Sequence, residues 1–223
     1  MSPKRANEET GIPFLHELRA VPNAGVMVRV PSQLTSCVAG DEVRLGLADF
    51  KIALVIAHTR LTDVTRMRST NRAVTNMRTQ FRGAAGEIAF VRWCEAHGLT
   101  GEFPFLNDEL GRPDALVAGT HVEIMTAAAE HQDATGFCVP PSKLKAAVAR
   151  SNGRNGLYVF VGVPTRAEEK HVFSIRAAAK FSVLQNTEVV TTTVKDSSQS
   201  NHVVPRDHVL SPRDILAALT VAT

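Results

Sequence analysis

The segment 112–126, RPDALVAGTHVEIMT, decides how the rest of this chain is interpreted. It contains two β-prone runs, 115–118 and 121–126, on either side of Gly119-Thr120. A two-residue connection that contains glycine, placed between two such runs, predicts a tight β-hairpin. The hairpin in turn fixes which polar side chains of the segment can meet.

Pairing across this turn would set Asp114 opposite Met125 and diagonal to Glu123, on a face that also carries His121. Diagonal neighbours lie about 7–8 Å apart at Cα, with their side chains closer. Two carboxylates at that separation can share a hard divalent cation such as Mg²⁺, with Mn²⁺ as a substitute. The bound cation would offset their repulsion and could activate water towards a phosphodiester. Each residue alone has a simpler interpretation, since Pro-Asp is common in turns and a strand glutamate is usually solvated.

Glu87 is the acidic residue of a segment that is otherwise almost entirely apolar. From Ala84 to Cys94, Arg92 is the other charged exception. A glutamate in a buried helix needs a partner. That partner is either the same cation, with Glu87 as a third carboxylate, or one of the arginines of the chain.

In this order, a helix with Glu87, then Pro113-Asp114, then Glu123-Ile124-Met125, the chain resembles the PD-(D/E)xK nuclease superfamily, the restriction-endonuclease-like fold. The resemblance covers about residues 47–176 and depends on the order of short, degenerate motifs. It implies a central mixed β-sheet flanked by helices, dependence on Mg²⁺, and DNA as the substrate. It also implies Asp114 and Glu123 as metal ligands, with Glu87 as an accessory acidic residue and metal ligand.

Met125 completes the candidate catalytic set, at a position where this family usually has a lysine that orients or activates the attacking water. Methionine has a similar length but no charge, so it fills the space without stabilising an anion. Three interpretations stay open. Met125 replaces a natural lysine in an altered chain, or Lys143 or Lys145 on the next helix serves instead, or the protein binds DNA without cleaving it.

Hydrophobic periodicity and turn residues predict the elements around the hairpin. Helices are expected over 47–67, 81–97, 143–150 and 212–219, and strands over 25–30, 137–139, 157–163, 171–175 and 187–194. Gly98 is expected to end the second helix, and Ser142 is expected to cap the start of the third. Ser211 is expected to cap the last helix, with Pro212 as its first residue and Asp214 as its third. Residues 195–201 are expected to form a polar loop. The pattern indicates an α/β fold, with the core over 41–180, an N-terminal extension over 1–40, and a strand and helix of the same domain over 181–223.

Length and composition fit one globular domain, since the chain has 223 residues of which 44% are hydrophobic and 21% charged. The three cysteines, Cys37, Cys94 and Cys138, show no zinc spacing and no disulfide framework, and are expected as small buried side chains. Residues 1–11 lack the apolar core of a signal peptide, and no run reaches the length of a membrane span. We therefore expect a soluble, cytoplasmic protein.

The basic residues near the first two helices suit phosphate contacts, although a solvated basic face is an equal alternative. A net charge of +3 is compatible with a polyanionic partner. The residues expected to contact nucleic acid are Arg72, Arg78, Arg82, Arg112, Lys143 and Lys145.

Together these features predict a Mg²⁺-dependent endonuclease that hydrolyses phosphodiester bonds of double-stranded DNA, of restriction or phage-defence type. Cleavage of both strands favours a homodimer, because a two-fold axis matches the symmetry of the duplex. The alternatives are a catalytically inactive DNA-binding protein of the same fold, a junction-resolving or repair nuclease, and an RNA-processing enzyme.

Overall fold

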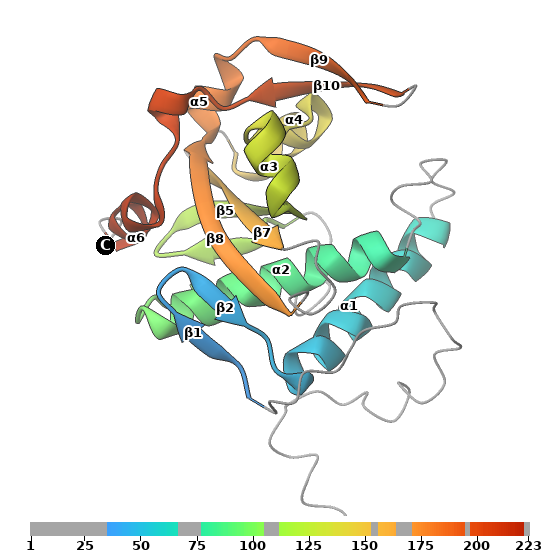
Figure 1. Ribbon diagram of the computed structural model, residues 1–223, viewed down its shortest axis with the longest axis vertical. Coiled ribbons are helices and arrows are strands. Elements are labelled where there is room, and N and C mark those ends of the chain that lie inside the picture. The colour runs from blue at the N-terminus through green and yellow to red at the C-terminus, as the bar shows by residue number, and fades with distance from the viewer. Residues whose placement is uncertain are drawn as a thin grey trace, which may run out of the picture.

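A seven-stranded mixed sheet, in the order β1-β2-β8-β7-β5-β4-β3, forms the centre of the molecule (Figure 1). The computed structural model describes residues 35–66, 77–104, 112–152, 156–163, 171–194 and 197–220. Only β5 and β7 are parallel neighbours; the other adjacent pairs in this sheet are antiparallel. The strands are β1 (Cys37–Ala39), β2 (Glu42–Arg44), β3 (Gly101–Glu102), β4 (Ala115–Val117), β5 (Thr120–Ala128), β7 (Gly156–Val163) and β8 (Val172–Lys180). The α/β class expected from the sequence is therefore confirmed.

Helices and a small second sheet cover the central sheet. In Figure 1, α1 and α2 lie below β5 and β7, and α3, α4 and the β9–β10 hairpin lie above these strands. The helices are α1 (Leu47–Arg66), α2 (Met77–Ala96), α3 (Ala129–Thr135), α4 (Pro141–Arg150), α5 (Phe181–Gln185) and α6 (Pro212–Thr220). The second sheet has the order β6-β10-β9, with β6 (Cys138–Val139), β9 (Val189–Val194) and β10 (Ser197–Val203).

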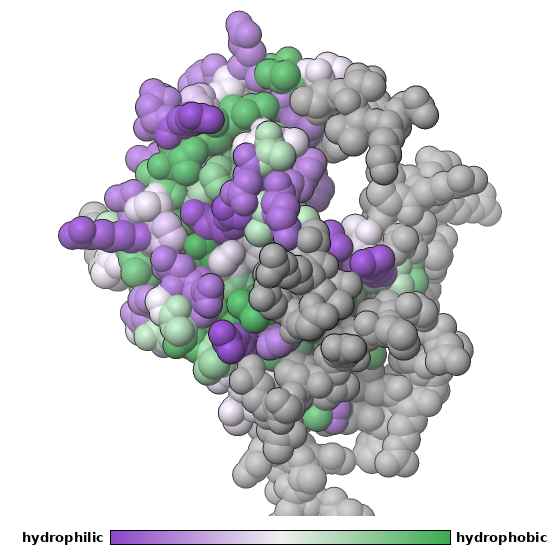
Figure 2. Space-filling model, in the orientation of Figure 1, coloured by the Kyte–Doolittle hydropathy of each residue, from purple (hydrophilic) through white to green (hydrophobic). Residues whose placement is uncertain are grey.

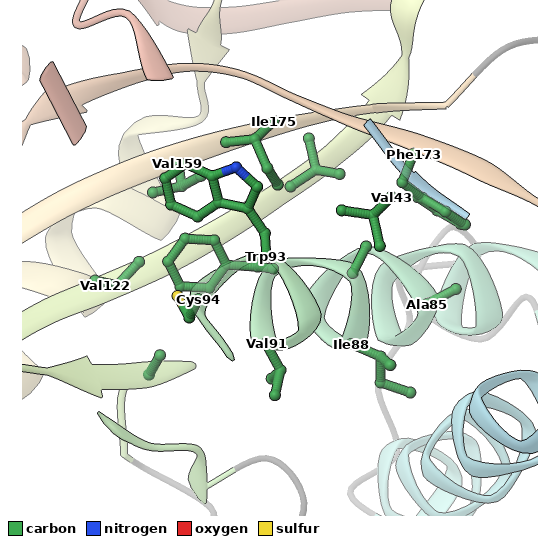
Figure 3. Packing of buried hydrophobic residues seen from close by; sticks show 14 of the residues in the cluster. Val43, Ala85, Ile88, Val91, Trp93, Cys94, Val122, Val159, Phe173 and Ile175 are labelled. Atoms are coloured by element: carbon green, nitrogen blue, oxygen red, sulfur yellow. The ribbon is translucent and has the colours of Figure 1, made fainter. Parts of the chain in front are cut away.

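The main core lies between α2 and the sheet, and it also takes in residues of α1 and α6. Trp93 points from α2 towards Val159 and Ile175, whereas Ile88 and Val91 point to the other side of the helix (Figure 3). The helix can be buried on both sides because it is apolar around most of its circumference. This burial places Glu87 of α2 inside the protein.

A second core lies on the opposite face of the sheet, under α4 and α5. Tyr158 and Phe160 of β7 are buried there with Phe181. Met125 of β5 packs against this cluster, whereas Val122 is buried in the main core. The odd and even positions of β5 therefore face different layers, as strand alternation requires. Figure 2 shows hydrophobic surface interspersed with hydrophilic side chains over this upper part of the molecule.

Several predicted ends are confirmed by their local chemistry. Gly98 follows α2 with a φ of +70°, the left-handed conformation that favours glycine after a helix. Ser211 and Asp214 form the expected capping box, with Ser211 Oγ donating to the Asp214 carboxylate over 2.6 Å and the Asp214 amide donating to Ser211 Oγ over 3.3 Å. The central strand β7 is buried along its whole length, as its continuous apolar run predicts.

The hairpin prediction was wrong in its turn and register. Ala118 and Gly119 form the turn, with φ values of 46° and 77°, and Val117 pairs with Thr120. Positive φ at both central residues is what a tight hairpin turn of this kind needs. A turn at 118–119 is not indicated by the sequence, because alanine rarely adopts positive φ.

Other predictions need correction. Ser142 lies inside α4, which begins at Pro141 after Pro140, because proline suits the first helical position. The polar loop expected over 195–201 contains most of β10, whose strand comes from pairing with β9 and β6 and not from an apolar pattern. The helix expected from 81 begins at Met77, the strand expected to end at 175 continues to Lys180, and α3 and α5 were not predicted. The strand expected over 25–30 lies outside the described residues.

The cysteines differ in environment more than expected. Cys94 is buried, Cys138 is partly buried and Cys37 is exposed, so burial was wrong for Cys37. Its place on the edge strand β1 explains the exposure, since one side of an edge strand faces solvent. No helix in the described part of the chain is long and apolar enough to cross a membrane.

Candidate active site

The observed register brings Asp114 and Glu123 closer together than the predicted one. Ala115 pairs with Val122, so the same register continued by one residue sets Asp114 directly opposite Glu123. Directly opposed residues have Cβ atoms about 4.5–5.5 Å apart, less than the diagonal spacing expected above. The Ile124 backbone N–H donates to Oδ2 of Asp114 over 2.8 Å, which holds this carboxylate across the strand pair.

Glu123 is held by an arginine from the neighbouring helix. Arg150, the last residue of α4, donates from Nε to Oε1 over 3.1 Å and from Nη2 to Oε2 over 2.7 Å. Bidentate pairs of this kind are among the strongest hydrogen bonds in proteins. The Glu123 side chain is 8% exposed and the Arg150 side chain 28%, so the guanidinium lies over a buried carboxylate.

Glu87 is held in the same way from the opposite layer. Arg60 of α1 donates from Nη1 to Oε1 over 2.8 Å and from Nη2 to Oε2 over 2.7 Å. The sequence left two partners open for Glu87, a shared cation or an arginine. In the structure the partner of Glu87 is an arginine, Arg60. Both glutamates of the candidate site are thus buried and each is paired with one guanidinium.

The arginine pairs do not bring the pKa values of the two glutamates back to the ordinary range. Burial, followed by repulsion from Asp114, raises the pKa of Glu87 to about 7 against the opposing effect of Arg60. The same two causes raise the pKa of Glu123 to about 7 against the opposing effect of Arg150. Glu123 also adds to the raised pKa of Glu87, so the three predicted carboxylates form one electrostatic cluster.

Asp114 is at the centre of this cluster. Burial raises its pKa, while the hydrogen bond from Ile124 and the positive charges of Arg60, Arg150 and Lys143 lower it. Cations from α1 and from both ends of α4 therefore act on the same carboxylate. Positive charge from several elements converging on one acidic group is typical of a functional site.

The lysine position of the motif and the lysines of α4 can now be compared. Met125 packs against the second core, so its side chain lies among apolar groups. The Lys143 ammonium lowers the pKa of both Asp114 and Glu123. Lys145 is not among the described cations that affect these two groups. Of the two substitute lysines expected from the sequence, Lys143 is the one close to the carboxylates.

The predicted nucleic-acid contacts are only partly brought together. Arg78 and Arg82 lie one turn apart on α2, and burial together with repulsion from Arg78 lowers the pKa of Arg82. Arg112 lies 3.9 Å from the Glu102 carboxylate, and both side chains are exposed. Arg72 lies outside the described residues.

The donor chemistry of the site fits a hard divalent cation, on one condition. Mg²⁺ is commonly held by one or two carboxylates, with water and substrate phosphates filling the other positions. Asp114 and Glu123 supply such a pair, but Arg150 already donates one hydrogen bond to each Glu123 oxygen, so a metal would compete with the guanidinium for this carboxylate. Among the described residues, no three His, Cys, Asp or Glu side chains are close enough in this arrangement to hold an ion together.

Arg150 is the site residue that sequence reasoning missed. It follows Lys143 by seven residues, and this spacing puts both on one face of α4. That spacing was readable in the sequence, whereas the approach of α4 to Glu123 was not. Tyr158 was missed as well: it is the β7 neighbour of Glu123, and burial followed by the Glu123 charge raises its pKa.

Comparison of the chain with protein-family models, with curated proteins and with solved structures finds no match. The case for a function therefore depends on the geometry and chemistry described above.

The raised pKa values predict how stability changes with pH. Folded Glu87 and Glu123 hold their protons up to about pH 7, whereas an unfolded glutamate releases its proton near 4.5. Between these values the folded state binds more protons than the unfolded state, so the free energy of unfolding falls as pH rises. We expect the melting temperature without metal to fall from pH 5 to pH 7.5, by about 2–4 °C for each kcal/mol lost.

Scanning calorimetry across this range, with Glu87→Gln beside the parent, checks the prediction. The Gln variant removes one of the two titrating groups and should show a shallower decline. A melting temperature that rises steadily over the same range would contradict the expected sign.

Proposed function

We propose that this protein is a Mg²⁺-dependent nuclease that hydrolyses phosphodiester bonds of double-stranded DNA. The observation that carries the proposal is Asp114 set opposite Glu123 on the hairpin, with Glu87 near enough for the charges of both to raise its pKa. The buried carboxylates of Glu87 and Glu123 and the half-buried carboxylate of Asp114 repel one another, and such a cluster is stabilised when a divalent cation is bound. When bound, the metal would supply Lewis acidity and an activated water at the scissile phosphate.

The order of elements supports the same proposal. The helix α2 with Glu87 is followed by the antiparallel strands β3, β4 and β5, then by α4, then by β7 parallel to β5. The superfamily that the chain resembles has its motifs on elements in this order. A restriction or phage-defence role, a cytoplasmic location and a homodimer that cuts both strands belong to this proposal.

In this proposal, Lys143 takes the role that the motif lysine has in the superfamily that the chain resembles. Its ammonium is close enough to Asp114 and Glu123 to lower their pKa values, and it lies in the first turns of α4, above the hairpin face. The side chain is exposed, so it is free to meet a phosphate approaching from solvent. Arg78 and Arg82 on α2 are the proposed contacts to more distant phosphates of the duplex.

The roles of positions 125 and 143 can be separated by a paired exchange. We expect Lys143→Gln to lower DNA cleavage with Mg²⁺ by about 10²-fold or more, as loss of one group stabilising the transition state does. Met125→Lys in that background should restore a large part of the rate, because the new ammonium enters the same carboxylate cluster from β5. Lys145→Gln is the matched control and should lower the rate far less than Lys143→Gln, because Lys145 does not act on the pKa of Asp114 or Glu123.

Initial rates on supercoiled plasmid and on linear duplex measure these effects. If Lys145→Gln lowers the rate as much as Lys143→Gln, the assignment of Lys143 is wrong. If Met125→Lys creates cleavage in a parent that shows none, the lysine is missing at position 125 and Lys143 does not replace it.

A second candidate function is DNA binding without cleavage. It is favoured by the apolar packing of Met125 and by the pairing of every Glu87 and Glu123 carboxylate oxygen with a guanidinium. Incubation of the parent protein with duplex DNA and Mg²⁺ or Mn²⁺, beside an EDTA control, separates the two. Binding that is retained in EDTA, with no metal-dependent cleavage on any duplex tested, would favour this candidate over the nuclease.

A further inference from the structure

We propose that Arg150 is an exchangeable cation: it neutralises Glu123 while no metal is bound, and it moves to a substrate phosphate when a divalent cation takes its place. The inference rests on the proposed nuclease function and adds a positioning role for a residue that no motif identifies. Its consequence is that metal binding and DNA binding assist each other at this site.

The position of the guanidinium sets it in competition with a metal for Glu123. Both Glu123 oxygens accept from Arg150, over 3.1 and 2.7 Å, and the glutamate side chain is 8% exposed where the arginine is 28% exposed. The arginine therefore lies between the carboxylate and solvent. A cation that reaches Glu123 from solvent therefore competes with the guanidinium for the same two oxygens.

The place of Arg150 in the fold makes the exchange feasible. Arg150 is the last residue of α4, and its side chain reaches Glu123 from the end of the helix. A long, partly exposed side chain at a helix end can change rotamer without moving a packed backbone. Arg60, which pairs with Glu87 in the same way, lies inside α1 and not at its end. In this proposal Arg60 stays on Glu87 as the fixed counter-charge of the cluster.

The released guanidinium has a suitable ligand in the proposed substrate. A guanidinium binds phosphate through two parallel hydrogen bonds, with a geometry much like that used for a carboxylate. Lys143 lies two helical turns away on the same face of α4, so the two side chains form a short cationic row beside Asp114 and Glu123. A phosphodiester bound along this row would bring its own oxygens to the metal, as Mg²⁺ sites commonly require.

Calcium affinity measured without cleavage tests the exchange directly. Titration calorimetry with Ca²⁺ at pH 8.5, above the pKa of both glutamates, is applied to the parent, Arg150→Gln, Arg150→Lys and the exposed control Arg213→Gln. We expect Arg150→Gln to bind Ca²⁺ roughly tenfold more tightly than the parent, within the usual range of coupling between two sites. The same variant should bind duplex DNA in Ca²⁺ more weakly, by a similar factor, because the phosphate contact is lost.

Arg150→Lys keeps a charge but loses the bidentate geometry, so its Ca²⁺ affinity should rise less and its DNA affinity should fall less. It also carries the test if Arg150→Gln does not fold, as thermal unfolding will show. Arg213→Gln should leave both affinities at the parent values.

The outcomes distinguish the inference from the proposed function. If the parent binds Ca²⁺ and the Arg150 variants bind it equally or less tightly, the exchange is wrong while the nuclease proposal stands. If neither the parent nor any Arg150 variant binds Ca²⁺, with or without DNA, the metal-dependent function is wrong and the exchange falls with it.

Discussion

Replacing Asp114 by asparagine is expected to lower Mg²⁺-dependent cleavage of duplex DNA by at least about 10³-fold, which corresponds to ~4 kcal/mol of transition-state stabilisation. Asp114 is the group that both glutamates respond to, and it lies opposite Glu123 where a shared cation would be bound. The amide oxygen of asparagine is a much weaker ligand for Mg²⁺ than a carboxylate. Loss of this one negative charge should therefore remove metal affinity and activity together.

The same substitution should leave the fold intact, and this makes the test sharp. Asparagine keeps an oxygen that can accept the hydrogen bond from Ile124, and it removes the repulsion towards Glu87 and Glu123. We expect the melting temperature without metal to be unchanged or higher, and the Mg²⁺-dependent increase that we expect for the parent to disappear. Asp133→Asn is the matched control, because Asp133 is an exposed carboxylate on α3 that pairs with Arg176 and does not act on the pKa of Asp114, Glu123 or Glu87. Full cleavage activity in Asp114→Asn would contradict the proposed site.

How much of this site was readable in the sequence is clearest at the hairpin. Strand alternation correctly predicted that Glu123 and Met125 share one face of β5 and that Val122 and Ile124 lie on the other. The register was wrong by two residues because Ala118 adopts a φ of 46°, a conformation that local preference assigns to glycine or asparagine. A shift of two keeps every side chain on its face, which is why the predicted residues still meet.

Elements set by tertiary pairing were harder to predict than elements set by local chemistry. The capping box at Ser211 and the glycine after α2 are local signals, and both were predicted correctly. The strand β10 is polar and forms because β9 and β6 pair with it on its two sides. The Arg150–Glu123 pair joins residues 27 positions apart and depends on where α4 packs, which no local pattern specifies.

Gly86→Ala is expected to destabilise the protein by roughly 2–3 kcal/mol, because α2 lies too close to β5 at this point to admit a side chain. A Cβ atom on Gly86 would lie 1.9 Å from Oγ1 and 2.8 Å from Cβ of Thr126. Both contacts are with a short side chain on a central strand, so the helix itself would have to move. Glu87 is the next residue of that helix, and the same movement would disturb its pair with Arg60.

Gly83→Ala is the matched control on the same helix, where an added Cβ meets nothing within 4 Å. Alanine there should stabilise the protein by up to about 1 kcal/mol, since glycine is unfavourable inside a helix. Thermal unfolding should thus show a higher melting temperature for Gly83→Ala and one lower by about 5–10 °C for Gly86→Ala. Adding Thr126→Ala to Gly86→Ala removes the shorter contact but leaves the one to Cβ, so only part of the loss should be recovered. Equal melting temperatures for the two glycine variants would mean that α2 does not approach β5 as closely as described, and the placement of Glu87 beside the hairpin carboxylates would lose its support.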